Sequence, residues 1–260
     1  FRRVLFRSDI HSHILPGIDD GAKNISMTLE MIKMAEKSGT KDIVATPHFC
    51  RGYGETPYDE VKNLVGEFNK LAKKDGLDIN IHYGQEVYYS EQIIDDYKSG
   101  LIGTINNSRY MLIELPMRSF DRDTLEVIYE LQVKGVIPIL AHPERYRPII
   151  EKPERINKFI NEGFLFQMNA GSIEGQFGNS VKKTTEILLA NNIYNFIGSD
   201  AHNDTNRCTG IANGIELAKK KSKINEELFR ESGRRLLNNE DIEFIGEKVK
   251  EKRGIFSFLK

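Results

Sequence analysis

The chain has 260 residues, of which 39% are hydrophobic, so it is long enough for one substantial core and lies within the size range of a single α/β barrel. Its 37 basic and 38 acidic residues nearly balance, which excludes an overall charge that would draw the protein to nucleic acid. Cys50 and Cys208 form no CxxC pair, and no apolar run approaches the ~20 residues that span a bilayer, so we expect a cytoplasmic protein without a disulfide framework.

The first eight residues carry three arginines and no long apolar stretch, so we do not expect them to form a signal peptide. We interpret residues 1–8 as a non-native or extra segment, and we expect the first strand to begin near Asp9.

Short apolar runs then alternate with amphipathic helical patterns. Ser26 is the expected N-cap of the first helix, and Thr56-Pro57 is expected to begin the second. The predicted helices cover 26–39, 56–76, 91–98, 121–134, 153–161 and 181–190, and helical patterns continue to the C-terminus. The further predicted strands are 42–46, 78–83, 110–113, 136–140, 165–168 and 195–197.

These seven strand–helix units show no break in composition, so we predict one domain, residues 9–246, and a tail, residues 247–260, that is basic and then apolar. Continuous apolar strands between amphipathic helices indicate a parallel sheet covered by helices. A closed barrel is favoured over a doubly wound open sheet, because a barrel brings more strand ends together on one face.

Five of the six histidines stand beside carboxylates, Gly or Pro just after short apolar runs, and two lone glutamates follow similar runs. Imidazole and carboxylate are ligands for Zn, Mn and Fe, and this set exceeds what one ion needs, so it indicates a cluster of two or three metals. Asp20 has an equally simple interpretation as a solvated acid, and His82, inside a strand, is interpreted as structural or solvent-facing. The candidate metal ligands are His11, His13, Asp20, His48, Glu86, Glu114, His142, Asp200 and His202.

Two arginines follow candidate ligands closely: Arg145 after His142, and Arg207 after His202. Guanidinium groups beside metals suit the bidentate capture of phosphate oxygens, although surface arginines are also common. The sequence has no Cys-x5-Arg loop of thiol phosphatases, no GxxxxGK[ST] phosphate loop and no GxSxG elbow. These absences favour direct, metal-assisted hydrolysis of a phosphate ester.

These motifs resemble those of the bacterial PHP-type protein-tyrosine phosphatases, manganese-dependent enzymes encoded with capsular and exopolysaccharide genes. The resemblance runs from about Asp9 to Arg207. Residues 9–22 read DIHSHILPGIDDGA, and the later motifs follow in order as ATPH (45–48), GQEV (84–87), IE (113–114), AHPERY (141–146), NAGS (169–172) and GSDAH (198–202).

The resemblance implies a distorted (β/α)7 barrel of the PHP type that holds three metal ions, with Mn²⁺ expected and Fe an alternative. It also implies that Arg145 and Arg207 grip the phosphate. The implied ligands are His11, His13, Glu86 and Asp200 for the first ion, Glu86, Glu114 and His142 for the second, and Asp20, His48 and His202 for the third.

The implied substrate is the phosphotyrosine tail of a membrane-associated bacterial tyrosine kinase that regulates polysaccharide synthesis. Two alternatives stay open: a small-molecule phosphatase such as the PHP-type histidinol phosphatase, and an inactive metal-binding partner protein. The sequence is compatible with a homo-oligomer. Its C-terminal tail could contact an anionic membrane, although a frayed or self-packed terminus is the simpler expectation.

Overall fold

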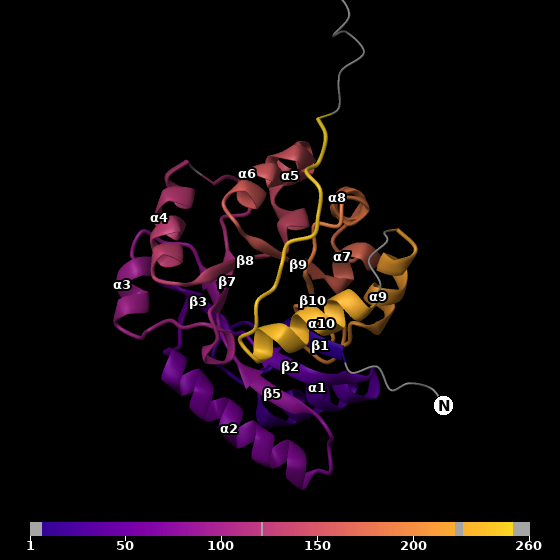
Figure 1. Ribbon diagram of the computed structural model, residues 1–260. Coiled ribbons are helices and arrows are strands. Elements are labelled where there is room, and N and C mark those ends of the chain that lie inside the picture. Colours follow the sequence, from indigo (N-terminus) through magenta and orange to yellow (C-terminus); the bar gives the residue numbers. More distant parts are fainter. Residues whose placement is uncertain (1–6, 121, 222–225, 252–260) are drawn as a thin grey trace, which may run out of the picture.

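The computed structural model describes residues 7–120, 122–221 and 226–251, and its strands form a barrel surrounded by helices (Figure 1). The strands are β1 (Arg7–Ser12), β2 (Thr40–Ala45), β3 (His48–Cys50), β4 (Gly54–Glu55), β5 (Asn80–Tyr83), β6 (Glu86–Tyr88), β7 (Tyr110–Glu114), β8 (Ile137–Ala141), β9 (Leu165–Asn169) and β10 (Phe196–Gly198). The α-helices are α1 (Ile25–Lys37), α2 (Tyr58–Lys74), α3 (Ile93–Lys98), α4 (Arg122–Val133), α5 (Arg147–Glu151), α6 (Ile156–Asn161), α7 (Ala170–Glu174), α8 (Asn179–Ala190), α9 (Ala212–Lys219) and α10 (Glu226–Leu237). Three short 3-10 helices are η1 (Ile105–Asn107), η2 (Pro143–Arg145) and η3 (Pro153–Arg155).

Two sheets join to close the barrel. One has the order β1-β2-β5 and the other the order β10-β9-β8-β7-β6-β3-β4. β3 continues the path of β2 after Pro47, and β6 continues that of β5, with the Glu86 amide donating to the Pro47 carbonyl at 3.0 Å. At the other seam, a parallel bridge joins Ser12 to Ala201. If β2–β3 and β5–β6 are each counted as one strand, the described residues form a barrel of seven parallel strands, in which β4 alone runs antiparallel to its neighbour. The predicted α/β class and distorted seven-stranded barrel are confirmed.

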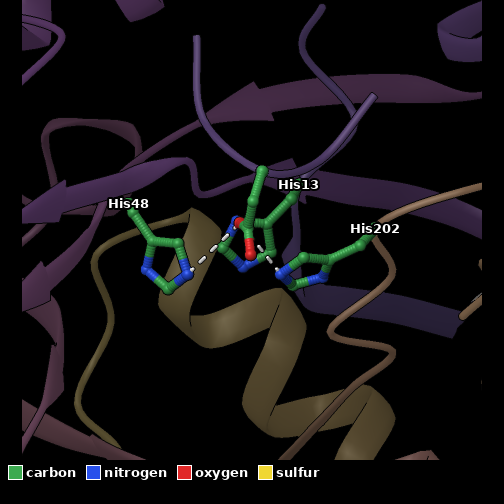
Figure 2. Close-up of side chains that lie close together, drawn as sticks. His13, His48 and His202 are labelled. Carbon is green, nitrogen blue, oxygen red and sulfur yellow. Dashed lines mark ion pairs between the residues drawn. The ribbon is translucent and has the colours of Figure 1, made fainter. Parts of the chain in front are cut away.

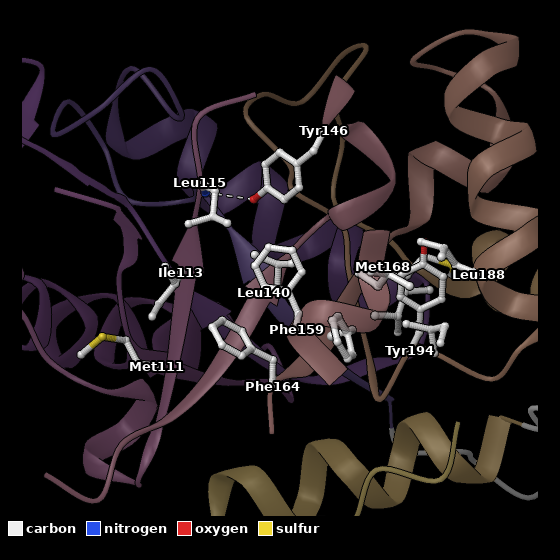
Figure 3. Close-up of a cluster of buried hydrophobic side chains, with 14 of the residues drawn as sticks. Met111, Ile113, Leu115, Leu140, Tyr146, Phe159, Phe164, Met168, Leu188 and Tyr194 are labelled. Carbon is white, nitrogen blue, oxygen red and sulfur yellow. Dashed lines mark hydrogen bonds between the residues drawn. The ribbon is translucent and has the colours of Figure 1, made fainter. Parts of the chain in front are cut away.

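Alternation along the strands separates the barrel interior from the outer layer. In β7, Tyr110 and Leu112 belong to a hydrophobic cluster with residues from β1, β2, β8, β9 and β10. Because these strands surround the barrel axis, this cluster fills the barrel interior. Met111 and Ile113 belong instead to the larger cluster between the strands and the helices, shown in Figure 3. The same alternation places Glu114, the last residue of β7, on the interior side at the C-terminal mouth of the barrel.

The helix starts differ in detail from the prediction. α1 begins at Ile25, and its cap is Asn24, whose side chain accepts a hydrogen bond from the Met27 amide, rather than Ser26. Pro57 is the cap position of α2 and offers no side-chain hydrogen bond. The short strands β3, β4 and β6 were not predicted, because segments of two or three residues carry no periodic pattern of their own.

The expectation of helices up to the C-terminus is wrong for residues 238–251, which contain no regular element. Asn239 takes a left-handed conformation (φ 55°) after α10, and the chain then runs across the molecule as the yellow segment of Figure 1. Both backbone groups of the buried Val249 bond to the Asn157 side chain, at 2.9 Å each. Residues 247–249, predicted as tail, therefore pack onto the domain. Residues 252–260 lie outside the described residues, and so does the membrane contact that was the less favoured alternative for the tail.

At the N-terminal end, β1 begins at Arg7, two residues before the predicted start. The Arg7 guanidinium pairs with Glu226 at 2.8 Å and donates to the Ser38 carbonyl at 3.0 Å, so this residue is tied to both α10 and the end of α1. Residues 1–6 of the predicted extra segment lie outside the described residues. Among the helices of the described ranges, none is long and apolar enough to cross a membrane.

Candidate metal centre

The structure brings all nine predicted ligands together at the C-terminal mouth of the barrel. Each comes from a strand end or from the loop just after one, as parallel strands in a barrel require. Four overlapping groups have ligand atoms that all lie within 4.8 Å of one another. The groups are His13, Asp20, His48 and His202; His11, Glu86 and His142; His11, His13 and Asp200; and His48, Glu86 and Glu114.

Glu86 lies at the centre of this cluster and is fully buried. Its Oε1 is 2.9 Å from Nε2 of His142, and its Oε2 is 3.0 Å from Nδ1 of His48. The same Oε2 lies 3.2 Å from Nε2 of His11 and 3.3 Å from Nε2 of His13. One carboxylate therefore faces four imidazole rings, which places it where it could bridge two ions.

The outer part of the cluster is built around Asp20. Its Oδ1 lies 3.3 Å from Nε2 of His202 and 3.6 Å from Nε2 of His48, and Figure 2 shows these two rings and His13 turned toward one another. The ring centroids of His13 and His202 are 4.0 Å apart. This grouping matches the third set implied by the resemblance and adds His13 to it.

Several observations fit divalent cations at this cluster. Within the described part of the chain, the buried Nδ1 atom of His142 has no hydrogen-bond partner, and none of the three imidazole nitrogens near Oε2 of Glu86 meets it with hydrogen-bond geometry. Nε2 of His11 and Nε2 of His13 approach to 3.2 Å, so lone pairs converge on one point unless a proton or a cation lies between them. The donors are imidazole nitrogens and carboxylate oxygens, which suit Mn, Fe and Zn.

Arg145 and Arg207 lie at the rim and converge on one carboxylate. Nη1 of Arg145 and Nη2 of Arg207 are each 2.8 Å from Oδ2 of Asp200. The Phe177 ring packs against both guanidinium groups, with 4.5 Å from its centroid to Cζ of Arg145 and 5.8 Å to Cζ of Arg207. Their side chains are 22% and 31% exposed, whereas Asp200 is buried, so the two cations separate this carboxylate from solvent.

The family described as "Capsular polysaccharide synthesis, CpsB/CapC" matches residues 7–238. This chain belongs to the CpsB/CapC family. The match confirms the resemblance drawn from the motifs.

Relatives in this family cover nearly the whole chain. CapC from Staphylococcus aureus is 38% identical over 235 residues, which are 90% of this chain and 92% of CapC. YwqE from Bacillus subtilis, named a tyrosine-protein phosphatase, is 32% identical over 96% of this chain and 99% of YwqE. A solved chain from a study of YwqE and Streptococcus pneumoniae CpsB, described as metal-dependent tyrosine phosphatases, superposes with a TM-score of 0.88 at 30% identity, covering 95% of this chain and 100% of that one.

In this CpsB/CapC protein, two side chains that the sequence reasoning missed orient the ligands. Asp19 accepts hydrogen bonds from Nδ1 of His13 at 2.7 Å and from the His48 amide at 3.0 Å. Gln167 Oε1 lies 3.0 Å from Nδ1 of His11 and also accepts from the His142 amide at 3.2 Å. Partners of this kind fix the ring orientation and tautomer of ligating histidines. The available signals were an acid beside Asp20 and a polar residue inside an apolar strand.

His82, which the sequence analysis set apart from the candidate ligands, lies outside the metal cluster. It sits on β5, and its Nε2 is 3.0 Å from Oδ1 of Asp42. Burial opposes ionisation of Asp42, but the hydrogen bonds from His82 and Asn80 hold the pKa of this carboxyl below its ordinary value. His82 therefore has a structural partner and provides a matched control for the clustered histidines.

The electrostatic surroundings shift the pKa values of the ligands in different directions. Burial disfavours a charged His13, but its hydrogen bonds to Asp19, Asp200 and Glu86 raise the pKa of this ring well above its ordinary value. Burial and the neighbouring charge of Glu86 raise the pKa of Glu114 to about 9. Without metal, Glu114 therefore carries a proton at neutral pH, and the protonated form of His13 is favoured. Burial and the positive charge of Arg145 lower the pKa of His142 to about 4, which leaves that ring neutral.

Metal uptake by this CpsB/CapC protein should therefore release protons, because ligands bind in their deprotonated forms. We expect the heat of Mn²⁺ binding at neutral pH to depend on the ionisation enthalpy of the buffer, and the affinity to fall as the pH is lowered. Glu114→Gln should release fewer protons, whereas His82→Gln should release as many as the parent. Binding heats that are the same in every buffer would contradict the raised pKa values.

Proposed function

We propose that this chain is a metal-dependent protein-tyrosine phosphatase. The observation that carries the proposal is the buried histidine–carboxylate cluster with two arginines at its rim. It is supported by family membership and by relatives that are named tyrosine-protein phosphatases, among them YwqE and CpsB of Streptococcus agalactiae. The proposed substrate is the phosphotyrosine tail of a membrane-associated bacterial tyrosine kinase that regulates capsular or exopolysaccharide synthesis, reached from the cytoplasm.

The proposed cofactors are three Mn²⁺ ions, with Fe as the alternative. The proposed ligands are His11, His13, Glu86 and Asp200 for the first ion, Glu86, Glu114 and His142 for the second, and Asp20, His48 and His202 for the third. When bound, such ions would supply positive charge beside the phosphoryl group and a water of lowered pKa as the attacking group. The position of the Glu86 carboxylate among four imidazole rings supports this assignment.

The chain's own residues would bind and orient the phosphoryl group. Arg145 and Arg207 converge on Oδ2 of Asp200 and keep part of their guanidinium groups exposed, so each can turn N–H donors toward a phosphate oxygen. Phe177 stacks on both cations and restricts the positions that they can take. The leaving phenolate of tyrosine has an ordinary pKa of about 10, so it departs with less need of protonation than an alkoxide.

A comparison of three substrates tests the proposal: a Tyr-phosphorylated peptide, its Ser-phosphorylated counterpart and histidinol phosphate. We expect kcat/KM for phosphotyrosine to lead by at least about tenfold, or about 1.4 kcal/mol of transition-state preference. Faster turnover of histidinol phosphate would identify a small-molecule phosphatase with the same cluster. Metal-loaded protein that hydrolyses none of the three would indicate a binding protein without phosphatase activity.

A further inference from the structure

A second cationic site is formed by segments that follow the candidate ligands Glu114 and His142 along the chain. It is a pocket of about 340 Å³ that we call the rim pocket, lined by Arg118, Phe120, Glu151, Arg155 and Lys158, with Ser119 and Pro148. Its walls come from the loop after β7 and from the segment α5–η3–α6, which Figure 1 places on the same side of the barrel. The metal cluster uses none of these residues.

The charge of the rim pocket is poorly neutralised. It has three cationic side chains and one carboxylate, Glu151, whose Oε1 already accepts a hydrogen bond from Nε of Arg147 at 2.9 Å. Arg118 and Lys158 have no carboxylate partner within the described ranges, and Arg155 only approaches the Pro148 carbonyl at 3.5 Å. Such a concave cluster of cations attracts an anionic group, and two guanidinium forks suit a carboxylate or a phosphate.

The walls of the rim pocket are held in place by packing. The Phe120 ring packs edge-on against Phe159, with centroids 5.3 Å apart, and against Tyr146 at 6.3 Å. The Tyr146 hydroxyl accepts a hydrogen bond from the Leu115 amide at 3.0 Å, which ties this ring to the loop after β7. Because these rings are fixed, an incoming anion would not have to order the pocket before binding.

The rim pocket belongs to the same mouth of the barrel as the metal centre. Arg118 follows Glu114 by four residues, and Pro148 follows Arg145 by three. The Arg147 amide donates to the Met117 carbonyl at 2.8 Å, which ties the two loops together just beyond the residues that face the cluster. A peptide whose phosphotyrosine enters the centre would therefore pass close to the rim pocket with its neighbouring residues.

We propose that the rim pocket binds a second anionic group of the same substrate chain, a carboxylate or phosphate on a residue near the phosphotyrosine. This inference rests on the proposed function and deepens it, because it assigns the substrate class as phosphotyrosine segments with acidic or multiply phosphorylated flanks. Arg118 and Arg155 contact the anion, Lys158 adds positive charge, and Phe120 forms the apolar wall.

The test uses the metal-loaded full chain and three peptides that share one phosphotyrosine: neutral flanks, Asp/Glu flanks, or a second phosphotyrosine nearby. Para-nitrophenyl phosphate, which is too small to reach the rim pocket, is the reference substrate. We expect Arg118→Ala/Arg155→Ala to raise KM about five- to tenfold for the anionic peptides while kcat and the reference rate stay unchanged. The anionic peptide whose KM rises more in the double variant identifies which group, carboxylate or phosphate, the rim pocket prefers.

Lys70→Ala/Lys74→Ala removes two positive charges from exposed positions on α2, on the far side of the molecule from α5 and α6, and should leave every KM unchanged (Figure 1). Lys158→Glu reverses the charge of one exposed side chain and should also raise KM for the anionic peptides. If the parent hydrolyses all peptides with equal KM, the rim pocket proposal is overturned and the proposed function stands. If no phosphotyrosine substrate is hydrolysed, the proposed function fails and the rim pocket proposal fails with it.

Discussion

Removing metal with a chelator should reduce hydrolysis of a phosphotyrosine peptide to the background rate, and Mn²⁺ should restore it best among divalent ions. Asp200 is paired with both arginines, and it is the bound cations that would supply an attacking water of lowered pKa. The four ligand groups contain imidazole and carboxylate but no thiolate, a set that favours Mn or Fe over a closed zinc site. Elemental analysis before and after treatment provides the measurement.

A pair of histidine variants separates the cluster from the rest of the fold. His11→Gln removes a fully buried ring that lies 3.2 Å from Oε2 of Glu86 and 3.6 Å from Oδ1 of Asp200. It should lower both metal content and kcat/KM by at least about 10²-fold. His82→Gln, outside the cluster, should change neither, and circular dichroism should show both variants folded. Full activity in demonstrably metal-free protein would end the metallophosphatase assignment.

The ligands at the strand ends could be predicted because all parallel strands of a barrel end on the same face. A run of apolar residues followed by His or Glu places that residue at the mouth of a parallel barrel, whatever the loop after it does. His11, Glu114 and Asp200 could therefore be assigned to one face from the sequence, although they are far apart along the chain. Alternation in β7 then turns Glu114 inward without further information.

The loop after β1 shows where such reasoning ends. Asp19 and Asp20 are adjacent acids, yet Asp19 holds Nδ1 of His13 while Asp20 faces His202. The difference depends on how the loop folds back: a Cβ atom at Gly21 would collide with the His13 carbonyl oxygen, so only glycine permits this approach. Close backbone contacts of this kind are set by the tertiary structure, and the local sequence pattern does not encode them.

The C-terminal segment was mispredicted for a related reason. Residues 238–251 have helical composition, but their backbone partners are side chains and carbonyls of other elements. The Glu247 amide donates to the Asn191 carbonyl at 2.8 Å, and the Asn157 side chain bonds to both the amide and the carbonyl of Val249. Tertiary hydrogen bonds thus replaced the intrahelical ones, which is how tertiary context overrides helix propensity.

Replacing Arg145 with Ala should lower kcat/KM for a phosphotyrosine peptide with neutral flanks by about 10²–10³-fold, because a bidentate contact to phosphate oxygens tightens as charge spreads in the transition state. Arg145→Lys should recover only part of the loss, since an ammonium group cannot reproduce the planar fork. Arg147→Ala is the matched control, because this arginine is 71% exposed, pairs with Glu151 and does not contact the cluster.

Metal content distinguishes a direct role of Arg145 from an indirect one. Asp200 keeps the Arg207 contact at 2.8 Å when Arg145 is removed, so the carboxylate should stay in place and elemental analysis should find as much metal in Arg145→Ala as in the parent. If metal is lost in proportion to activity, Arg145 acts by holding Asp200 rather than by gripping phosphate. A variant that hydrolyses phosphotyrosine as fast as the parent would remove Arg145 from the mechanism and would leave Arg207 as the candidate that binds the phosphoryl group.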